Sequence, residues 1–238
     1  MLIKTKVIVL STVKYQEKSV IVKCFTKTDG LKSYFVRDAF SSKKGNQKMA
    51  YFQPLTLLEI EANHKNKGTL EHFKEIKLAT TFQTIPLNVV KSTIVMFLSE
   101  MLNNSIQEEE RNEPLFIFIE NALIWLDHHD QIANFHLVFL LEITKFLGFY
   151  PDTSNLNESP LFDMSSGVFS TLPHPGALTE HETNLFKKLL VLKFDTDQKS
   201  FNSIERQLLL KILIAYYGLH LDGFRKPKAL EVLKEVFL

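Results

Sequence analysis

The spacing of the apolar residues changes once along this chain, near residue 80, and this change limits the possible folds more than any other feature. Residues 1–80 contain short runs rich in Val, Ile and Thr, separated by polar or glycine-containing turns, as is typical of strands. From Pro86 onward, the apolar residues recur with helical spacing. The sequence therefore predicts an α+β fold with two domains, residues 1–80 and residues 81–238.

The first domain is expected to be a small β-barrel. Its strand-like runs cover residues 5–13, 19–25, 31–39, 49–62 and 69–78, with a turn at Asp29-Gly30. Five short strands fit a closed barrel better than a sandwich, which needs about seven strands. The five-stranded OB-fold β-barrel is the leading candidate.

The second domain is expected to be all-α. Helices are predicted over residues 87–102, 113–126, 132–147, 203–217 and 227–237, and a Thr179/Glu182 capping box begins another. Between about 149 and 178 the helical period is lost and Pro and Gly collect, so this cysteine-free stretch is expected to be an irregular insert.

The charge is distributed unevenly. The whole chain has 28 Lys plus Arg and 27 Asp plus Glu, but residues 1–80 hold 15 and 7 of these, leaving 13 and 20 for the rest. A basic N-terminal domain on a nearly neutral protein predicts one face that binds a polyanion.

One segment combines basic and aromatic residues, as single-stranded nucleic acid binding requires. The predicted DNA-binding residues are Lys32, Arg37, Lys43, Lys44 and Lys48, interleaved with Tyr34, Phe35, Phe40, Tyr51 and Phe52. The alternative is that the aromatic residues fill the barrel and the lysines belong to a solvated loop.

Several classes of protein are excluded by pattern. Cys24 is the only cysteine, which excludes a disulfide framework and a cysteine zinc site. No run reaches the ~18 apolar residues of a membrane span, and no signal peptide is recognised, so a reducing cytoplasm is expected. Phosphate-loop, dinucleotide-loop, nucleophile-elbow and H-E-x-x-H patterns are absent, so the chain is not expected to be an enzyme.

Four segments, taken in their order, carry a family resemblance. The chain opens with VIVLSTVKYQEKSVIVKCFTKTDGLKSYFVRDA and continues with YFQPLTLLEIE. Leu147-Gly148-Phe149-Tyr150-Pro151 follows a long helix, and GFRKPKALEVLKEVF lies at the C-terminus. Nearly end to end, the chain resembles the bacterial RecO recombination mediators.

This resemblance implies an OB barrel followed by a helical domain, and a cytoplasmic, nucleoid-associated protein. It implies binding of single- and double-stranded DNA and annealing of complementary strands without covalent chemistry. The implied partners are RecR and the C-terminal tail of the single-stranded-DNA-binding protein, with RecA served indirectly and no membrane involved. Two alternatives remain: a translation-associated, RNA-binding OB protein, and a protein–protein scaffold that binds no nucleic acid.

The chain departs from the family pattern at two places. The family has a basic-Gly step in its basic segment, where this chain has Arg37-Asp38, and Asp38 offsets the local charge. Many members carry a four-cysteine zinc finger, but residues 152–176 contain no cysteine and offer only His174. No zinc or other cofactor is therefore expected, and packing of Leu161, Phe162 and Phe169 is expected to take the place of the metal.

Overall fold

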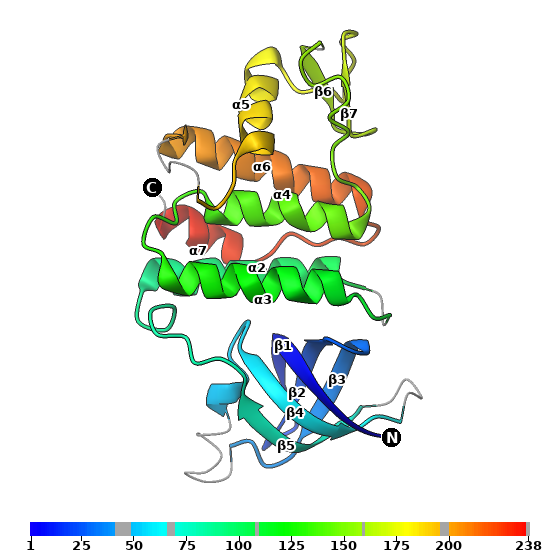
Figure 1. Cartoon of the computed structure of the whole chain (residues 1–238), viewed down its shortest axis with the longest axis vertical. Coiled ribbons are helices and arrows are strands. Elements are labelled where there is room, and N and C mark those ends of the chain that lie inside the picture. The colour runs from blue at the N-terminus through cyan, green and yellow to red at the C-terminus, as the bar shows by residue number, and fades with distance from the viewer. Residues whose placement is uncertain (41–48, 66–69, 108–109, 159, 196–199, 237–238) are drawn as a thin grey trace. The chain divides into compact units, whose positions relative to one another are not determined.

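The structure is a computed structural model that describes residues 1–40, 49–65, 70–107, 110–158, 160–195 and 200–236 (Figure 1). It divides into two compact units, Met1–His128 with Pro227–Ala229, and His129–Lys226 with Leu230–Leu238. The first unit thus contains helices as well as the sheet. The domain division predicted at residue 80 follows the change from strands to helices and stays a prediction.

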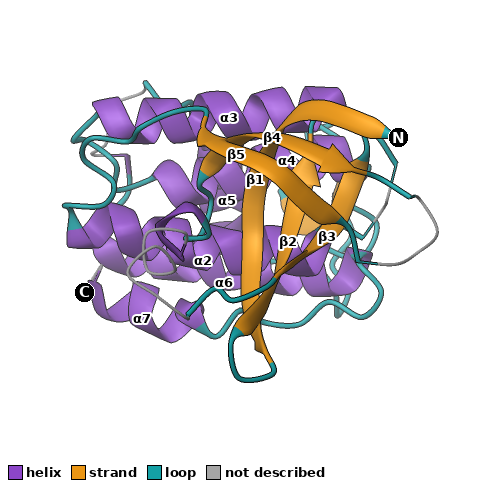
Figure 2. Cartoon of the chain, turned by 90° about the horizontal axis from the view of Figure 1, so that it is seen from below, coloured by secondary structure: helices purple, strands orange, loops and turns teal. Residues whose placement is uncertain are grey.

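Five antiparallel strands form the sheet of the first unit, in the order β3-β2-β1-β4-β5 (Figure 2). Their register is continuous except for irregularities between Val9 and Ser11 and between Glu61 and Ala62. The bounds are β1 Leu2–Tyr15, β2 Ser19–Thr26, β3 Gly30–Val36, β4 Leu57–Asn63 and β5 His72–Leu78.

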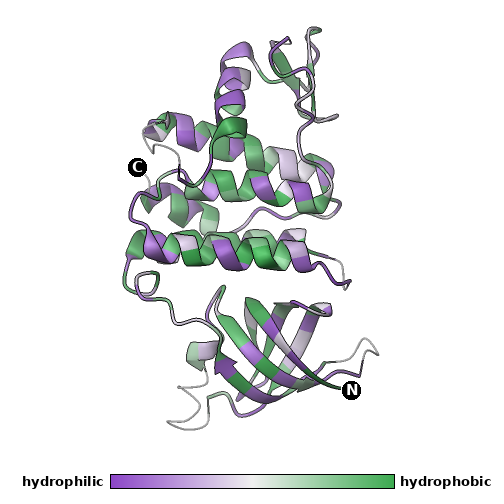
Figure 3. Cartoon of the chain, viewed as in Figure 1, coloured by the Kyte–Doolittle hydropathy of each residue, from purple (hydrophilic) through white to green (hydrophobic). Residues whose placement is uncertain are grey.

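The inner face of the sheet forms an apolar core. Because side chains alternate along a strand, every second residue of β2, namely Val20, Val22 and Cys24, enters this core. Tyr34 and Phe52 are also buried there, and the ring of Phe73 stacks on both of them. The strands accordingly show apolar and polar segments in turn (Figure 3).

The predicted α+β class is confirmed, but the prediction of a closed barrel is wrong. One isolated parallel bridge joins Tyr34 of the edge strand β3 to Glu71, the residue directly before the other edge strand, β5. Phe35 N donates to Glu71 O at 2.9 Å and Glu71 N donates to Ser33 O at 2.8 Å. Among the residues that the structure describes, this is the one bridge between the two edges, and from His72 onward β5 pairs with β4. The sheet curls without closing.

The prediction of one strand over residues 49–62 is wrong in its first part. Residues 49–51 are helical, and β4 begins only at Leu57. Pro54, whose nitrogen cannot donate a ladder hydrogen bond, lies in the turn between them.

Two helices of the first unit, α2 (Val89–Ser105) and α3 (Glu113–His128), cover part of the side of the sheet that faces away from the apolar core. Ser99 Oγ of α2 donates to Leu10 O at 2.5 Å, and Lys6 Nζ lies 2.7 Å from Glu120 Oε1 of α3. Phe25 and Phe116 pack with ring centroids 6.1 Å apart. These contacts occupy the outer face of β1 and β2 near Lys6, Leu10 and Phe25.

The second unit contains α4 (Phe135–Leu147), α5 (Glu180–Val191) and α6 (Ser203–His220); α7 (Ala229–Val236) begins in the first unit and continues in the second. Tyr217 Oη of α6 donates to Leu140 O of α4 at 2.7 Å. The Thr179/Glu182 capping box at the start of α5 is confirmed. None of the helices that the structure describes is both long and apolar enough to cross a membrane.

The insert predicted to be irregular contains a short hairpin, β6 (Leu161–Asp163) and β7 (Val168–Ser170). Phe162 is fully buried, and its ring lies 5.0 Å from Phe169 and 4.7 Å from Phe186 of α5. The apolar packing expected of Phe162 and Phe169 is therefore present, and Leu161 is half-buried beside them in the chain.

Candidate nucleic-acid interface

The outer face of β1, β2 and β3 is partly free of the helices. Val13, Ile21 and Phe35 stand opposite one another across the three strands. Val13 is exposed, whereas Ile21 and Phe35 are half-buried. This end of the sheet thus presents an apolar strip, which we call the outer sheet face.

Three rings line the outer sheet face, and we call them the aromatic row. The ring of Phe35 lies 5.9 Å from that of Tyr15 at 88°, and 5.9 Å from that of His72 at 89°. The bridge between Tyr34 and Glu71 explains why His72 of β5 lies beside Phe35 of β3. Tyr15 and His72 are exposed and Phe35 supports both, so the row offers aromatic surface to solvent.

Cations continue the same strand faces. Lys23 comes two residues after Ile21, so alternation places it on the outer side of the sheet. Lys74 comes two residues after His72, across the register shift of β5, and its ion pair with Glu61 fixes its position. Lys23 is half-buried, which lowers the pKa of its ammonium group, and its Nζ lies 3.4 Å from Asn103 O. Lys74 Nζ lies 3.8 Å from Glu61 Oε2 and is exposed.

The predicted DNA-binding residues fall into different settings. Arg37 is exposed directly after β3, two residues beyond Phe35. Lys32 is half-buried within β3. Lys43, Lys44 and Lys48 lie outside the described residues, so no placement is assigned to them. Whether any of the five binds DNA stays a prediction.

The interleaved aromatic residues also divide. Tyr34 and Phe52 are buried in the sheet core, as the alternative interpretation expects. Phe35 and Tyr51 are half-buried, and Phe40 is 44% exposed. Of this set, Phe35 is the one that the structure places in the aromatic row.

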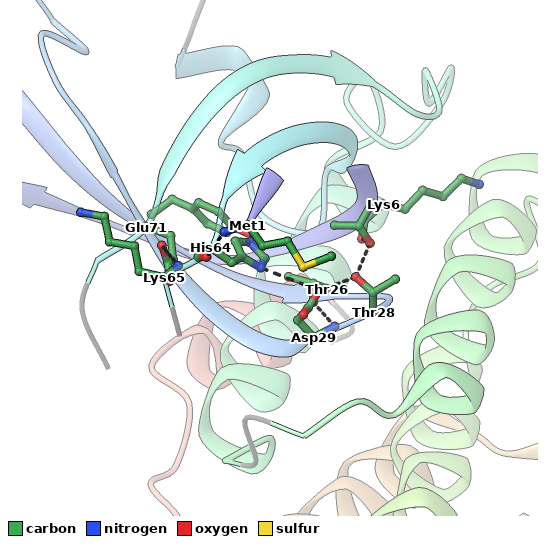
Figure 4. A network of polar contacts seen from close by, with 10 residues as sticks. Met1, Lys6, Thr26, Thr28, Asp29, His64, Lys65 and Glu71 are labelled. Carbon is green, nitrogen blue, oxygen red and sulfur yellow. Dashed lines mark hydrogen bonds and ion pairs between the residues drawn. The ribbon is translucent and has the colours of Figure 1, made fainter. Parts of the chain in front are cut away.

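Lys32 lies in register with Cys24, on the inner side of the sheet, and its charge acts on His64. His64 belongs to a cluster of polar contacts that includes Asp29, Lys65 and Glu71 (Figure 4). In this cluster Tyr34 Oη lies 2.8 Å from His64 Nε2, and Glu71 accepts hydrogen bonds from Lys65 N at 2.9 and 3.0 Å. Burial lowers the pKa of His64; Asp29 and Glu71 oppose this shift, and the charge of Lys32 adds to it. Lys32 therefore shares its surroundings with buried polar groups, whereas Arg37 is exposed.

A groove of about 330 Å³ lies over β1, β4 and β5. It opens on the outer side of the sheet, because Lys6, Glu59 and Lys77 lie in register there and alternate with residues of the inner core. Its charged residues have both signs, because three carboxylates lie among three lysines. Such a surface does not favour a phosphate backbone. The charged lining residues are Lys4, Lys6, Glu59, Glu61, Glu75 and Lys77.

Comparison with known proteins identifies the family. Residues 1–82 match the N-terminal domain of recombination protein O, and residues 87–229 match its C-terminal domain. The DNA repair protein RecO of Flavobacterium johnsoniae is 68% identical over 237 residues, and that of Flavobacterium psychrophilum is 69% identical over 238, both chains being covered completely. This chain belongs to the RecO family. The RecO of Bacteroides fragilis is 38% identical over 242 residues, again with both chains covered completely.

The insert of this RecO family member offers few zinc ligands. The Asp163 carboxylate accepts hydrogen bonds from Ser165 N at 2.8 Å and Ser166 Oγ at 2.5 Å, and His174 Nε2 lies 3.3 Å from it. Among the residues that the structure describes, no three His, Cys, Asp or Glu side chains gather as a metal site requires. One imidazole and one hydrogen-bonded carboxylate do not fit a structural zinc ion, which takes four ligands.

Sequence reasoning did not single out Tyr15, His72, Lys23 or Lys74 as members of this surface. The strand alternation could have grouped Tyr15 with Val13 and Lys23 with Ile21. His72 could not be found in this way, because it reaches Phe35 only through the bridge between β3 and β5.

Proposed function

We propose that this chain is a DNA repair and homologous recombination mediator that binds single- and double-stranded DNA and anneals complementary strands. Membership of the RecO family along the whole chain carries the proposal. The exposed cations and the aromatic row of the outer sheet face support it, because phosphates need positive charge and unpaired bases need aromatic surface.

The mediator acts through binding alone, and we do not assign it an enzymatic step. Annealing brings two polyanions together, so cations must neutralise both backbones. We propose that the chain works with RecR and engages the C-terminal tail of the single-stranded-DNA-binding protein, so that RecA gains access to the strand. Titration of the intact chain with a labelled tail peptide tests this contact, and absence of saturable binding would contradict it.

Strand annealing provides the central test. Complementary oligonucleotides, bare or coated with single-stranded-DNA-binding protein, are mixed with the chain, and duplex formation is followed by fluorescence. We expect acceleration in both cases. No acceleration with either substrate would reject the mediator function, whereas faster pairing of RNA than of DNA would favour an RNA-binding protein instead. A chain that shifts neither nucleic acid in a gel at moderate salt would be a protein–protein scaffold.

We also propose that the insert is held without zinc. The buried ring of Phe162 and the hydrogen bonds to Asp163 support this view. Prolonged treatment with a zinc chelator should leave the melting temperature and the annealing rate unchanged. Stoichiometric zinc in the purified chain, together with a lower melting temperature after chelation, would contradict the proposal.

A further inference from the structure

The aromatic row exposes ring surface in a part of the chain that is rich in cations. We infer that Tyr15, Phe35 and His72 form a base-stacking site that takes the unpaired bases of single-stranded DNA. The inference rests on the proposed function and narrows it, because it assigns the three rings to single strands alone and the surrounding cations to both forms of DNA.

The geometry of the rings suits stacking. Phe35 is half-buried and contacts each neighbour edge to face, at 88° and 89°. Such contacts leave ring surface of the outer two residues uncovered, and Tyr15 is 44% exposed. A base is flat and has a π-face, so it can stack on either exposed ring whatever its sequence.

The surrounding charge favours a nucleic acid over an apolar protein segment. Arg37 and Lys74 each follow a ring of the row by two residues. Arg37 is exposed directly after β3, and Lys74 of β5 is exposed and lies 3.8 Å from Glu61. Because the bridge between these strands is parallel, both cations lie beyond the row in the same chain direction. Lys23 also lies on the outer side of the sheet, two residues beyond Ile21 along β2 and therefore farther from the turn between β1 and β2. Positive groups on both sides of an aromatic strip match bases on the strip and phosphates along its borders.

Duplex DNA cannot use the row in the same way. Its bases are already stacked and paired, so a protein meets its phosphates first. Cations such as Arg37 should serve both forms of DNA, while the rings should serve only the single strand. The inference therefore predicts that one substitution in the row separates the two affinities.

The test compares Tyr15→Leu with Tyr15→Phe in the intact chain. Leucine keeps apolar surface but removes the ring, and phenylalanine keeps the ring but removes the hydroxyl. Affinities for a single-stranded oligonucleotide and for a duplex of the same length are measured at fixed salt. We expect Tyr15→Leu to weaken single-strand binding about fivefold or more, with duplex affinity unchanged, and Tyr15→Phe to behave as the parent.

A second readout follows the base itself. A single strand that contains 2-aminopurine should lose fluorescence on binding the parent chain, because the analogue stacks, and should lose less on binding Tyr15→Leu. If Tyr15→Leu proves unstable, His72→Ala at the exposed end of the row replaces it, with the same expectation.

Three results overturn the inference. If Tyr15→Leu weakens single-strand and duplex binding equally, the substitution has changed the surface in general. If it weakens neither, bases do not touch the row. In both cases the parent chain still binds DNA, so the proposed function stands. If the parent binds neither form of DNA, the proposed function fails together with the inference.

Discussion

A single glycine, Gly167, lets the insert pack closely against Tyr216 of α6. Gly167 has φ of +70°, and a Cβ atom at this position would lie 2.6 Å from Tyr216 Oη. Tyr216 cannot move away freely, because it is buried and its Oη donates to Phe149 O at 2.9 Å. The sequence marks Gly167 as a turn residue, but the close approach of Tyr216 depends on packing between distant segments and could not be read from it.

Gly167→Ala should therefore destabilise the chain by about 2–4 kcal/mol, through backbone strain together with the clash. Tyr216→Phe removes the clashing oxygen at the cost of one hydrogen bond, about 1 kcal/mol. In the Tyr216→Phe background, Gly167→Ala should cost at least about 1 kcal/mol less. Urea unfolding of the two single variants and the double variant measures this difference, and strictly additive values would show that Tyr216 does not limit the site.

At the scale of elements, the sequence predicted best what depends on local pattern. Helical periodicity located α2, α3, α4, α6 and α7 within a few residues, and the Thr179/Glu182 pair located the start of α5. The hairpin of β6 and β7 was missed, because three-residue strands are too short to show a period of two. The open sheet was not predicted, because whether β3 and β5 close a barrel depends on hydrogen bonds between residues far apart in the chain, and the bonds between Ser33, Phe35 and Glu71 join the two edges at one bridge.

The β6–β7 hairpin should lose stability in acid. Burial would raise the pKa of Asp163, but hydrogen bonds from Ser166 and Ser165 outweigh it, and with His174 they lower the pKa to about 2. The pKa of an ordinary aspartate is about 3.9. The stability that the ionised Asp163 carboxylate supplies is therefore complete above about pH 4 and is lost as the pH falls toward 2. It amounts to roughly 2 kcal/mol.

Asp163→Asn tests the assignment. The variant should be less stable than the parent near neutral pH, and the difference should shrink between about pH 4 and 2. Unfolding free energies across this range, with hydrogen exchange of the hairpin amides, measure it. A difference that stays constant with pH would show that the Asp163 carboxylate does not supply this stability.

At the scale of the whole molecule, the charge asymmetry governs how DNA binding responds to salt. Residues 1–80 carry 15 Lys plus Arg and 7 Asp plus Glu, so the sheet should supply most of the phosphate contacts. For single strands, the logarithm of affinity falls with the logarithm of salt concentration by about 0.7 for each phosphate neutralised.

Charge reversal should expose this asymmetry. Arg37→Glu should weaken single-strand and duplex binding and make the salt slope shallower by about 1. A triple variant, Lys43→Glu with Lys44→Glu and Lys48→Glu, should flatten it further. Lys211→Glu in α6 is the matched control and should leave affinity and slope unchanged. If Lys211→Glu lowers affinity as much as Arg37→Glu does, then lysines and arginines of residues 81–238 also contribute to DNA binding.

Because α2 and α3 occupy the outer side of β1 and β2 around Leu10 and Phe25, a strand bound along β1 and β2 finds room only past Val13 and Ile21. The occluded length per copy should thus fall near the lower end of the ~4–16 nucleotides seen for comparable domains. Coating a long filament would then require many copies side by side, and most of each captured strand would stay open for pairing with its complement.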